Sequence, residues 1–261
     1  IWDIMSKKEL LDKYKKESNK EKKGIEEIDI VSSETMKIAL TGYTKKECAL
    51  IKSVSESLDY IVSSHNLEHM PNPVQFFIDA SEILKEGGVL NIAIPISTRC
   101  LDFSRPLSTT GEILDAYIYK NKKPSLGNFF DHIFSTMSVI NEKNESITLN
   151  DMTFDFEKLI FNNELTYDSY KNLVCDYNNS SYKDSHIWQF NLDSFMLIFE
   201  DLLKCKVIEN LEIIDSEIIG IEFILSIRKN KNKKHTISSK ERRLNLKKKS
   251  LISYVSDLTI K

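Results

Sequence analysis

The sequence lacks any apolar run long enough to cross a lipid bilayer, and no secretory signal peptide is visible in its 261 residues. The formal net charge is only −3 with 29% charged residues, which argues against a dedicated nucleic-acid binder. The four cysteines are widely spaced and form no C-x-x-C pair, which is typical of reduced structural thiols. We therefore expect a cytoplasmic protein without a membrane span or a nucleic-acid partner, and the oligomeric state stays open.

The hydrophobic content of 41% is enough for one good core, so we expect one domain with additions. The stretch 58–95 organises the chain. It opens with a short apolar run, Leu58 to Val62, which ends in Ser63, Ser64 and His65. This pattern predicts a buried strand whose carboxyl end carries polar side chains.

A helix and a second strand follow. Apolar residues recur at helical spacing at Val74, Phe77, Ile78, Ile83 and Leu84. We expect Gly87-Gly88 to end this helix, because glycine readily takes the left-handed backbone conformation. A second apolar run begins at Val89 and ends at Pro95. Strand, helix and strand predict two parallel strands buried on both faces, with ligands bound at their carboxyl ends.

These residues carry a resemblance. The runs concerned are Leu58 to His65, Leu67-Glu68-His69, Pro73, Leu84-Lys85 and Gly87-Gly88. Together they resemble the middle of a class I S-adenosylmethionine-dependent methyltransferase, of the branch often found with bacterial surface-polysaccharide genes. The resemblance implies an α/β, Rossmann-like sheet, mostly parallel with its last strand antiparallel, and a helical insertion after the fifth strand. It implies S-adenosylmethionine as cofactor and methyl transfer to an oxygen or nitrogen of a small-molecule or saccharide acceptor.

The resemblance also assigns residues to the cofactor. Asp3 would end the second strand and accept hydrogen bonds from the ribose hydroxyls, while Asp29 and Ile30 would end the third strand near the adenine. Ser63, Ser64 and His65 would lie at the mouth between cofactor and acceptor, with His65 as a candidate base. No metal is required. The alternative for Asp3 and Asp29 is that they are ordinary polar strand ends.

One departure from the family concerns its first strand and glycine-rich loop, which would precede Asp3. The sequence begins at Ile1, and no G-x-G occurs in it. Two expectations follow and stay open. Either this is a fragment of a longer chain, or the chain does not bind the cofactor in the usual way and serves as a catalytically inactive binding or scaffold module.

The run from His65 to His69 also matches H-x-x-E-H, a zinc-peptidase signature. That chemistry needs both histidines one turn apart on a continuous helix, together with a distant third ligand. Pro71 and Pro73 forbid a long helix directly after this run. A zinc-dependent hydrolase is therefore the weakest alternative, and we expect His69 to be structural.

We divide the chain into a cofactor-side core (1–96), a helical lid for the acceptor (97–185), a helix and hairpin that complete the core (186–228), and a lysine-rich tail (229–261). In the lid, helices are expected at 112–119, from Phe129 onward, and within 154–182, with a loop at 141–150. The segment 98–107 resembles the family's post-strand segment. Four residues are candidates for the acceptor site: Arg99, Arg105, His186 and Trp188.

Three of the acceptor candidates have an alternative, namely the two arginines and Trp188. The arginines can grip an acidic substrate bidentately or anchor the lid through structural ion pairs. Trp188 can pack on the cofactor or acceptor, or belong to the core. Beyond it, a helix is expected near Asn191, then strands 206–214 and 219–227 joined by residues 215–217. The tail after Arg228 is expected to be flexible, with one terminal helix as a further option.

Overall fold

The computed structural model describes residues 2–3, 30–31, 55–56, 58–140, 146–147, 156–179, 183–232 and 239–259. The predicted cofactor residue Asp29 lies outside these ranges. Among the described helices, none combines the length and the apolar character that a membrane crossing requires.

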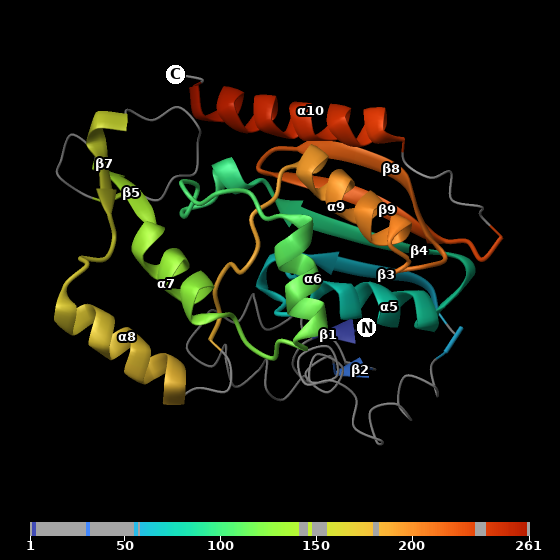
Figure 1. Cartoon of the computed structure of the whole chain (residues 1–261), viewed down its shortest axis with the longest axis horizontal. Helices are drawn as coiled ribbons and strands as arrows, with labels where there is room; N and C mark the ends of the chain where they lie inside the picture. Colours follow the sequence, from blue (N-terminus) through green and yellow to red (C-terminus); the bar gives the residue numbers. More distant parts are fainter. Residues whose placement is uncertain are drawn as a thin grey trace, which may run out of the picture.

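A four-stranded mixed sheet forms the centre of the molecule (Figure 1). Its strands lie in the order β3 (Leu58–Ser64), β4 (Leu84–Pro95), β9 (Glu222–Lys229) and β8 (Leu211–Ile219). β3 and β4 are parallel, whereas β9 is antiparallel to both of its neighbours. The predicted α/β class, the parallel pair and the antiparallel hairpin of the last two strands are confirmed.

Three helices cover one face of this sheet (Figure 1). They are α5 (Pro73–Ile83), α6 (Thr110–Ile118) and α9 (Leu192–Lys204). α5 begins where its pattern predicts, because the Asn72 side chain accepts the Gln75 N–H and proline occupies the first helical position. Apolar side chains from the three helices meet the inward-facing residues of β4 and β9, so the core lies between these two layers.

On β3, the face that points away from the three helices is exposed to solvent. Ile61 is buried, but Tyr60 and Val62 on either side of it are 69% and 67% exposed. Within the described residues, β3 forms the edge of the sheet and has only one covered face. The prediction that this strand is buried on both faces is therefore wrong, because alternate residues of a strand point to opposite faces.

The two glycines of the β3–β4 unit lie inside a strand and do not end the helix. α5 ends at Ile83, and β4 begins at Leu84. The pairing register shifts between Leu58 and Tyr60, where residues 85–88 bulge out of the ladder. Gly87 has φ +80°, so the expected left-handed conformation is present but serves the bulge.

The pair β1 (Trp2–Asp3) and β2 (Ile30–Val31) is parallel, with Asp3 opposite Val31. The resemblance implies strands at these two positions, and the structure describes both.

The insertion after β4 contains strands as well as helices. It begins with the short 3₁₀ helix η2 (Ser97–Arg99) and includes α7 (Leu126–Ser135), η3 (Phe156–Lys158) and α8 (Tyr167–Asn179). A small antiparallel sheet has the order β6 (Ser146–Ile147), β5 (Met137–Ile140) and β7 (Leu159–Phe161). The expected loop at 141–150 therefore includes a strand. In the described part of the expected helical stretch 154–182, η3 and β7 precede α8.

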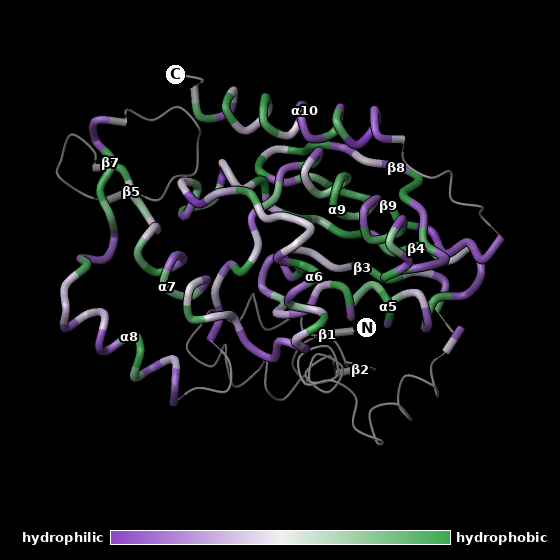
Figure 2. The backbone as a smooth tube through the Cα atoms, viewed as in Figure 1, coloured by the Kyte–Doolittle hydropathy of each residue, from purple (hydrophilic) through white to green (hydrophobic). Residues whose placement is uncertain are grey.

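The hairpin turn differs from expectation, whereas the tail contains the terminal helix that was the further option there. β8 continues through Asp215 and Glu217, so the chain turns later, at Gly220, where φ is +55°. The tail contains α10 (Lys240–Thr259), which packs against α9 and η2 and shows alternating hydrophobic and hydrophilic stretches (Figures 1 and 2). Asn191 donates from its buried side chain to the Ser250 carbonyl at 2.8 Å. Within the tail, Lys229 still belongs to β9, and Lys240–Thr259 form a docked helix.

Gly88→Ala should destabilise the protein, because a Cβ at this position would lie 3.0 to 3.1 Å from three backbone carbonyl oxygens, those of Lys85, Asp59 and Leu58. We expect the free energy of unfolding in urea to fall by about 1–3 kcal/mol. Gly111→Ala is the matched control, since its Cβ would meet only the Thr109 hydroxyl at 3.8 Å inside a helix. Equal stability of the two variants would contradict this explanation.

Candidate functional site

The carboxyl end of β3 places His65 in an unusual backbone conformation. His65 follows Ser64 and has φ +47°, which is uncommon for a residue with a side chain. Its backbone N–H donates to the Ala93 carbonyl at 3.0 Å, so the turn is tied to β4. Residues held in such conformations are often found at functional sites, because the surrounding structure has to enforce them.

The imidazole of His65 is paired with a carboxylate. Its Nε2 lies 2.6 Å from Oε2 of Glu222, the first residue of β9, which stands opposite Pro95 in the ladder. The His65 and Glu222 side chains are 40% and 26% exposed, so the pair is reachable from solvent. An imidazole oriented by a carboxylate is the usual arrangement of a general base.

The turn after His65 brings a buried acid beside a second histidine. Leu67–His69 is a single 3₁₀ turn, η1, and not the continuous helix that the zinc-peptidase arrangement requires. The Glu68 side chain is 2% exposed, and burial raises its pKa against the opposing effect of its own backbone amide and of His69. His69 Nδ1 lies 2.8 Å from Oδ1 of Asp184. Burial alone would lower the pKa of His69, but Asp184 and Glu68 raise it.

The segment 183–190 runs beside this turn and is fixed to it by the backbone. The N–H groups of Ile187 and Trp188 both donate to the Glu68 carbonyl, at 2.7 and 3.1 Å. The Trp188 indole donates to the Met70 carbonyl at 2.6 Å, and the residue is only 4% exposed. Trp188 thus lies in the core and holds the two segments together, and its role toward the cofactor or acceptor stays a prediction.

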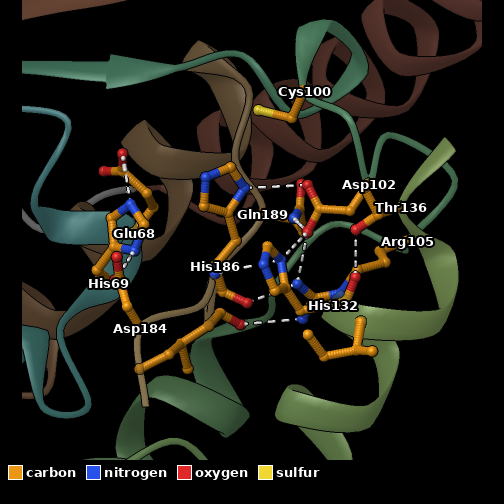
Figure 3. A network of polar contacts seen from close by, with 12 residues as sticks. Glu68, His69, Cys100, Asp102, Arg105, His132, Thr136, Asp184, His186 and Gln189 are labelled. Atoms are coloured by element: carbon orange, nitrogen blue, oxygen red, sulfur yellow. Dashed lines mark hydrogen bonds and ion pairs between the residues drawn. The ribbon is translucent and has the colours of Figure 1, made fainter. Parts of the chain in front are cut away.

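Asp102 is the centre of the polar network in Figure 3. It has no exposed surface, and its carboxylate accepts from four side chains. The donors are Arg105 (2.9 Å), Gln189 (2.9 Å), His186 (3.0 Å) and His132 (3.1 Å). Burial alone would raise the pKa of Asp102, but these donors outweigh it and hold the pKa far below its usual range.

The side chains of the two candidate arginines are hydrogen-bonded to other residues of the protein. Arg105 is 6% exposed, and besides Asp102 its guanidinium donates to the carbonyls of His186 and Ile187 at 2.6 and 3.3 Å. Arg99 donates to the Gly220 carbonyl in the hairpin turn. Both therefore anchor the insertion in this structure. A role in binding the acceptor stays a prediction for each.

The structure thus brings part of the predicted site together. Ser63, Ser64 and His65 lie at one strand end, and His186 joins the neighbouring network through Asp102. The sequence alone indicates no role for several residues that hold the site histidines or their network: Glu222, Asp184, Asp102, His132 and Gln189. Only Asp102 has a signal in the sequence that could have drawn attention to it, because it lies in the segment 98–107 that resembles the post-strand segment of the methyltransferase family. The others are distant in sequence and carry no local motif.

Comparison of the chain with protein-family models, with curated proteins and with solved structures found no match.

Asp102→Ala should destabilise the protein strongly, because it leaves the buried Arg105 charge and three further donors without their acceptor. We expect a loss of about 3–5 kcal/mol in the free energy of unfolding at neutral pH, measured by urea denaturation. Asp131→Ala, an exposed acid of α7, is the matched control and should change stability by less than about 0.5 kcal/mol. A small effect at Asp102 would mean that the network contributes little to the fold.

Proposed function

We propose that the protein is an S-adenosylmethionine-dependent methyltransferase that acts on an oxygen or nitrogen of a small-molecule or saccharide acceptor. The observation that carries the proposal is the strand arrangement. β9 runs antiparallel between β4 and β8, and this agrees with the reversed hairpin that the resemblance implies at the end of the sheet. The preceding pair β3–β4 is parallel, as the resemblance implies.

The chemistry of the strand ends fits a hydroxyl-rich nucleoside. Ser64 is exposed at the end of β3, next to the partly exposed His65. Hydroxyl and imidazole groups can both donate to and accept from sugar hydroxyls. In the proposal, Asp3 and Ile30 on the parallel strands β1 and β2 take the ribose and adenine positions. The cofactor supplies an electrophilic methyl group, and the chain holds the acceptor in line with it and excludes water.

His65 is the proposed base. When its Nε2–H is donated to Glu222, Nδ1 keeps the lone pair that can accept a proton from the acceptor. Glu222 would fix the ring orientation and stabilise the protonated imidazole. This function is most useful for an acceptor hydroxyl, whose proton has to leave as the new carbon–oxygen bond forms.

Titration calorimetry with S-adenosylmethionine tests the cofactor assignment. We expect one binding site per chain, and Asp3→Ala should weaken binding by about 10–100-fold, because a charged acceptor of hydroxyl donors is worth about 1.5–3 kcal/mol. Asp59→Ala is the matched control and should leave affinity unchanged, since Asp59 lies at the opposite end of β3 in an exposed ion pair with Lys85.

The titration should be run on the chain from Ile1 and on the product of the whole gene. Absence of binding in both would contradict the methyltransferase proposal and favour the catalytically inactive binding or scaffold module. Equal losses in Asp3→Ala and Asp59→Ala would remove Asp3 from the site.

His65→Gln tests the proposed base. With a hydroxyl acceptor, we expect the rate of methyl transfer to fall by about 10²–10⁴-fold. The affinity for S-adenosylmethionine should change much less, since a glutamine retains hydrogen-bonding capacity at this position. The rate is measured as S-adenosylhomocysteine release. An unchanged rate would show that His65 only positions its neighbours.

A further inference from the structure

Two histidines share an arrangement beside the buried Glu68 carboxylate. His69 Nδ1 lies 2.8 Å from Asp184 Oδ1, and His186 Nδ1 lies 3.0 Å from Asp102 Oδ1. In Figure 3 the second ring nitrogen of His186 lies on the side of Glu68 and His69. A histidine that binds a metal almost always has its other ring nitrogen held by a carboxylate, a carbonyl or a water. Both histidines meet this condition.

The Glu68 carboxylate supplies an independent observation. Within the described residues, neither of its buried oxygens accepts a hydrogen bond from another residue. Two imidazole nitrogens approach its Oε1, His69 Nε2 at 3.6 Å and His65 Nδ1 at 4.0 Å. A buried carboxylate without hydrogen bonds is costly, and a bound cation is a common way to compensate it. Glu68 therefore points to a ligand between these side chains.

We propose that Glu68, His69 and His186 bind a divalent first-row transition-metal ion. One ligand atom from each lies within 4.8 Å of the other two. Metal bonds of about 2.0–2.2 Å in a tetrahedral site place ligand atoms about 3.4 Å apart. The side chains therefore draw in by up to about 1.4 Å on binding. The backbone is already in place, because the amides of Ile187 and Trp188 tie His186 to the Glu68 turn.

The donor set indicates the class of metal. Two imidazoles and one carboxylate suit Zn²⁺, Co²⁺ and Fe²⁺, whereas Mg²⁺ and Ca²⁺ prefer oxygen ligands. Three protein ligands leave at least one coordination position open. The site differs from the H-x-x-E-H arrangement, because it uses His186 in place of His65. It does not depend on methyl transfer.

A second group, Cys100, Asp102 and His186, has similar spacing but less suitable chemistry. The Asp102 carboxylate already accepts from four side chains. Burial, and next to it the Asp102 charge, raises the pKa of the Cys100 thiol well above its usual range, so the metal-binding thiolate is disfavoured. Of this group, Asp102 contributes to the Glu68 site by holding Nδ1 of His186 at 3.0 Å.

The experiment is a titration of the chelator-treated full chain with Co²⁺, in which binding is measured by visible absorption. Zn²⁺ is then added to displace the bound Co²⁺. We expect one equivalent of Co²⁺ with ligand-field bands that Zn²⁺ abolishes. His186→Gln should weaken binding at least about 10-fold, whereas the control His132→Gln, which changes another partner of Asp102, should remain within about 3-fold. No saturable binding to the wild type, or equal losses in both variants, would overturn the proposal.

A second pair of variants avoids the buried residues, whose replacement can impair folding. Asp184 is 79% exposed and orients His69, so Asp184→Asn should keep the fold and weaken Co²⁺ binding by about 10–100-fold. Asp176→Asn is the matched control, because Asp176 is an exposed acid paired with Lys183 only 2.7 Å away. Equal affinity of these two variants would overturn the site. The expected Co²⁺ affinities do not depend on S-adenosylmethionine, so a failure to bind that cofactor would not change them.

Discussion

The fully buried carboxylate of Asp102 is the constraint on which the arrangement of the insertion depends. Its four donors come from three separate parts of the chain: the segment after β4, helix α7, and the segment that returns toward α9. A buried charge is stable only when it is fully hydrogen-bonded, so these parts must meet in one geometry. The histidine that faces Glu68, His186, is one of the donors. The position of this imidazole therefore depends on the same carboxylate that fastens the insertion to the sheet.

The two halves of the site are chemically different. The pair His65–Glu222 lies at strand ends and is reachable from solvent, as expected for a group that exchanges protons with a bound molecule. Glu68 is buried, and its neighbours His69 and His186 are largely enclosed, as expected for groups that are fixed in position. His65 Nδ1 lies 4.0 Å from Glu68 Oε1, so the two halves adjoin. A change of charge at Glu68 would accordingly be felt electrostatically by the imidazole at the sheet edge.

Much of the sheet was predictable, because short apolar runs and turn residues encode strands locally. The β3–α5–β4 unit and the final hairpin follow from such patterns, and His65 was placed at its strand end. Three features were not predictable. Gly87 and Gly88 serve a bulge, which depends on pairing with β3. β7 is a strand because it pairs with β5. The docking of α10, though not its existence, depends on distant partners such as Asn191. The partners of Asp102 and His65 are equally non-local, since Glu222 is separated from His65 by 157 positions.

The insertion leaves and re-enters the core at two points that touch. The Ser97 N–H, just after β4, donates to the Phe190 carbonyl at 2.7 Å, just before α9. Closing so long a loop costs little more entropy than closing a loop of half its length. Helix α6, which covers the sheet, lies between these two residues, but the chain beyond α6 can vary in length at little entropic cost to this closure. Such a junction allows the segments beyond α6, among them α7 and α8, to change in size while the sheet and the helices that cover it are kept.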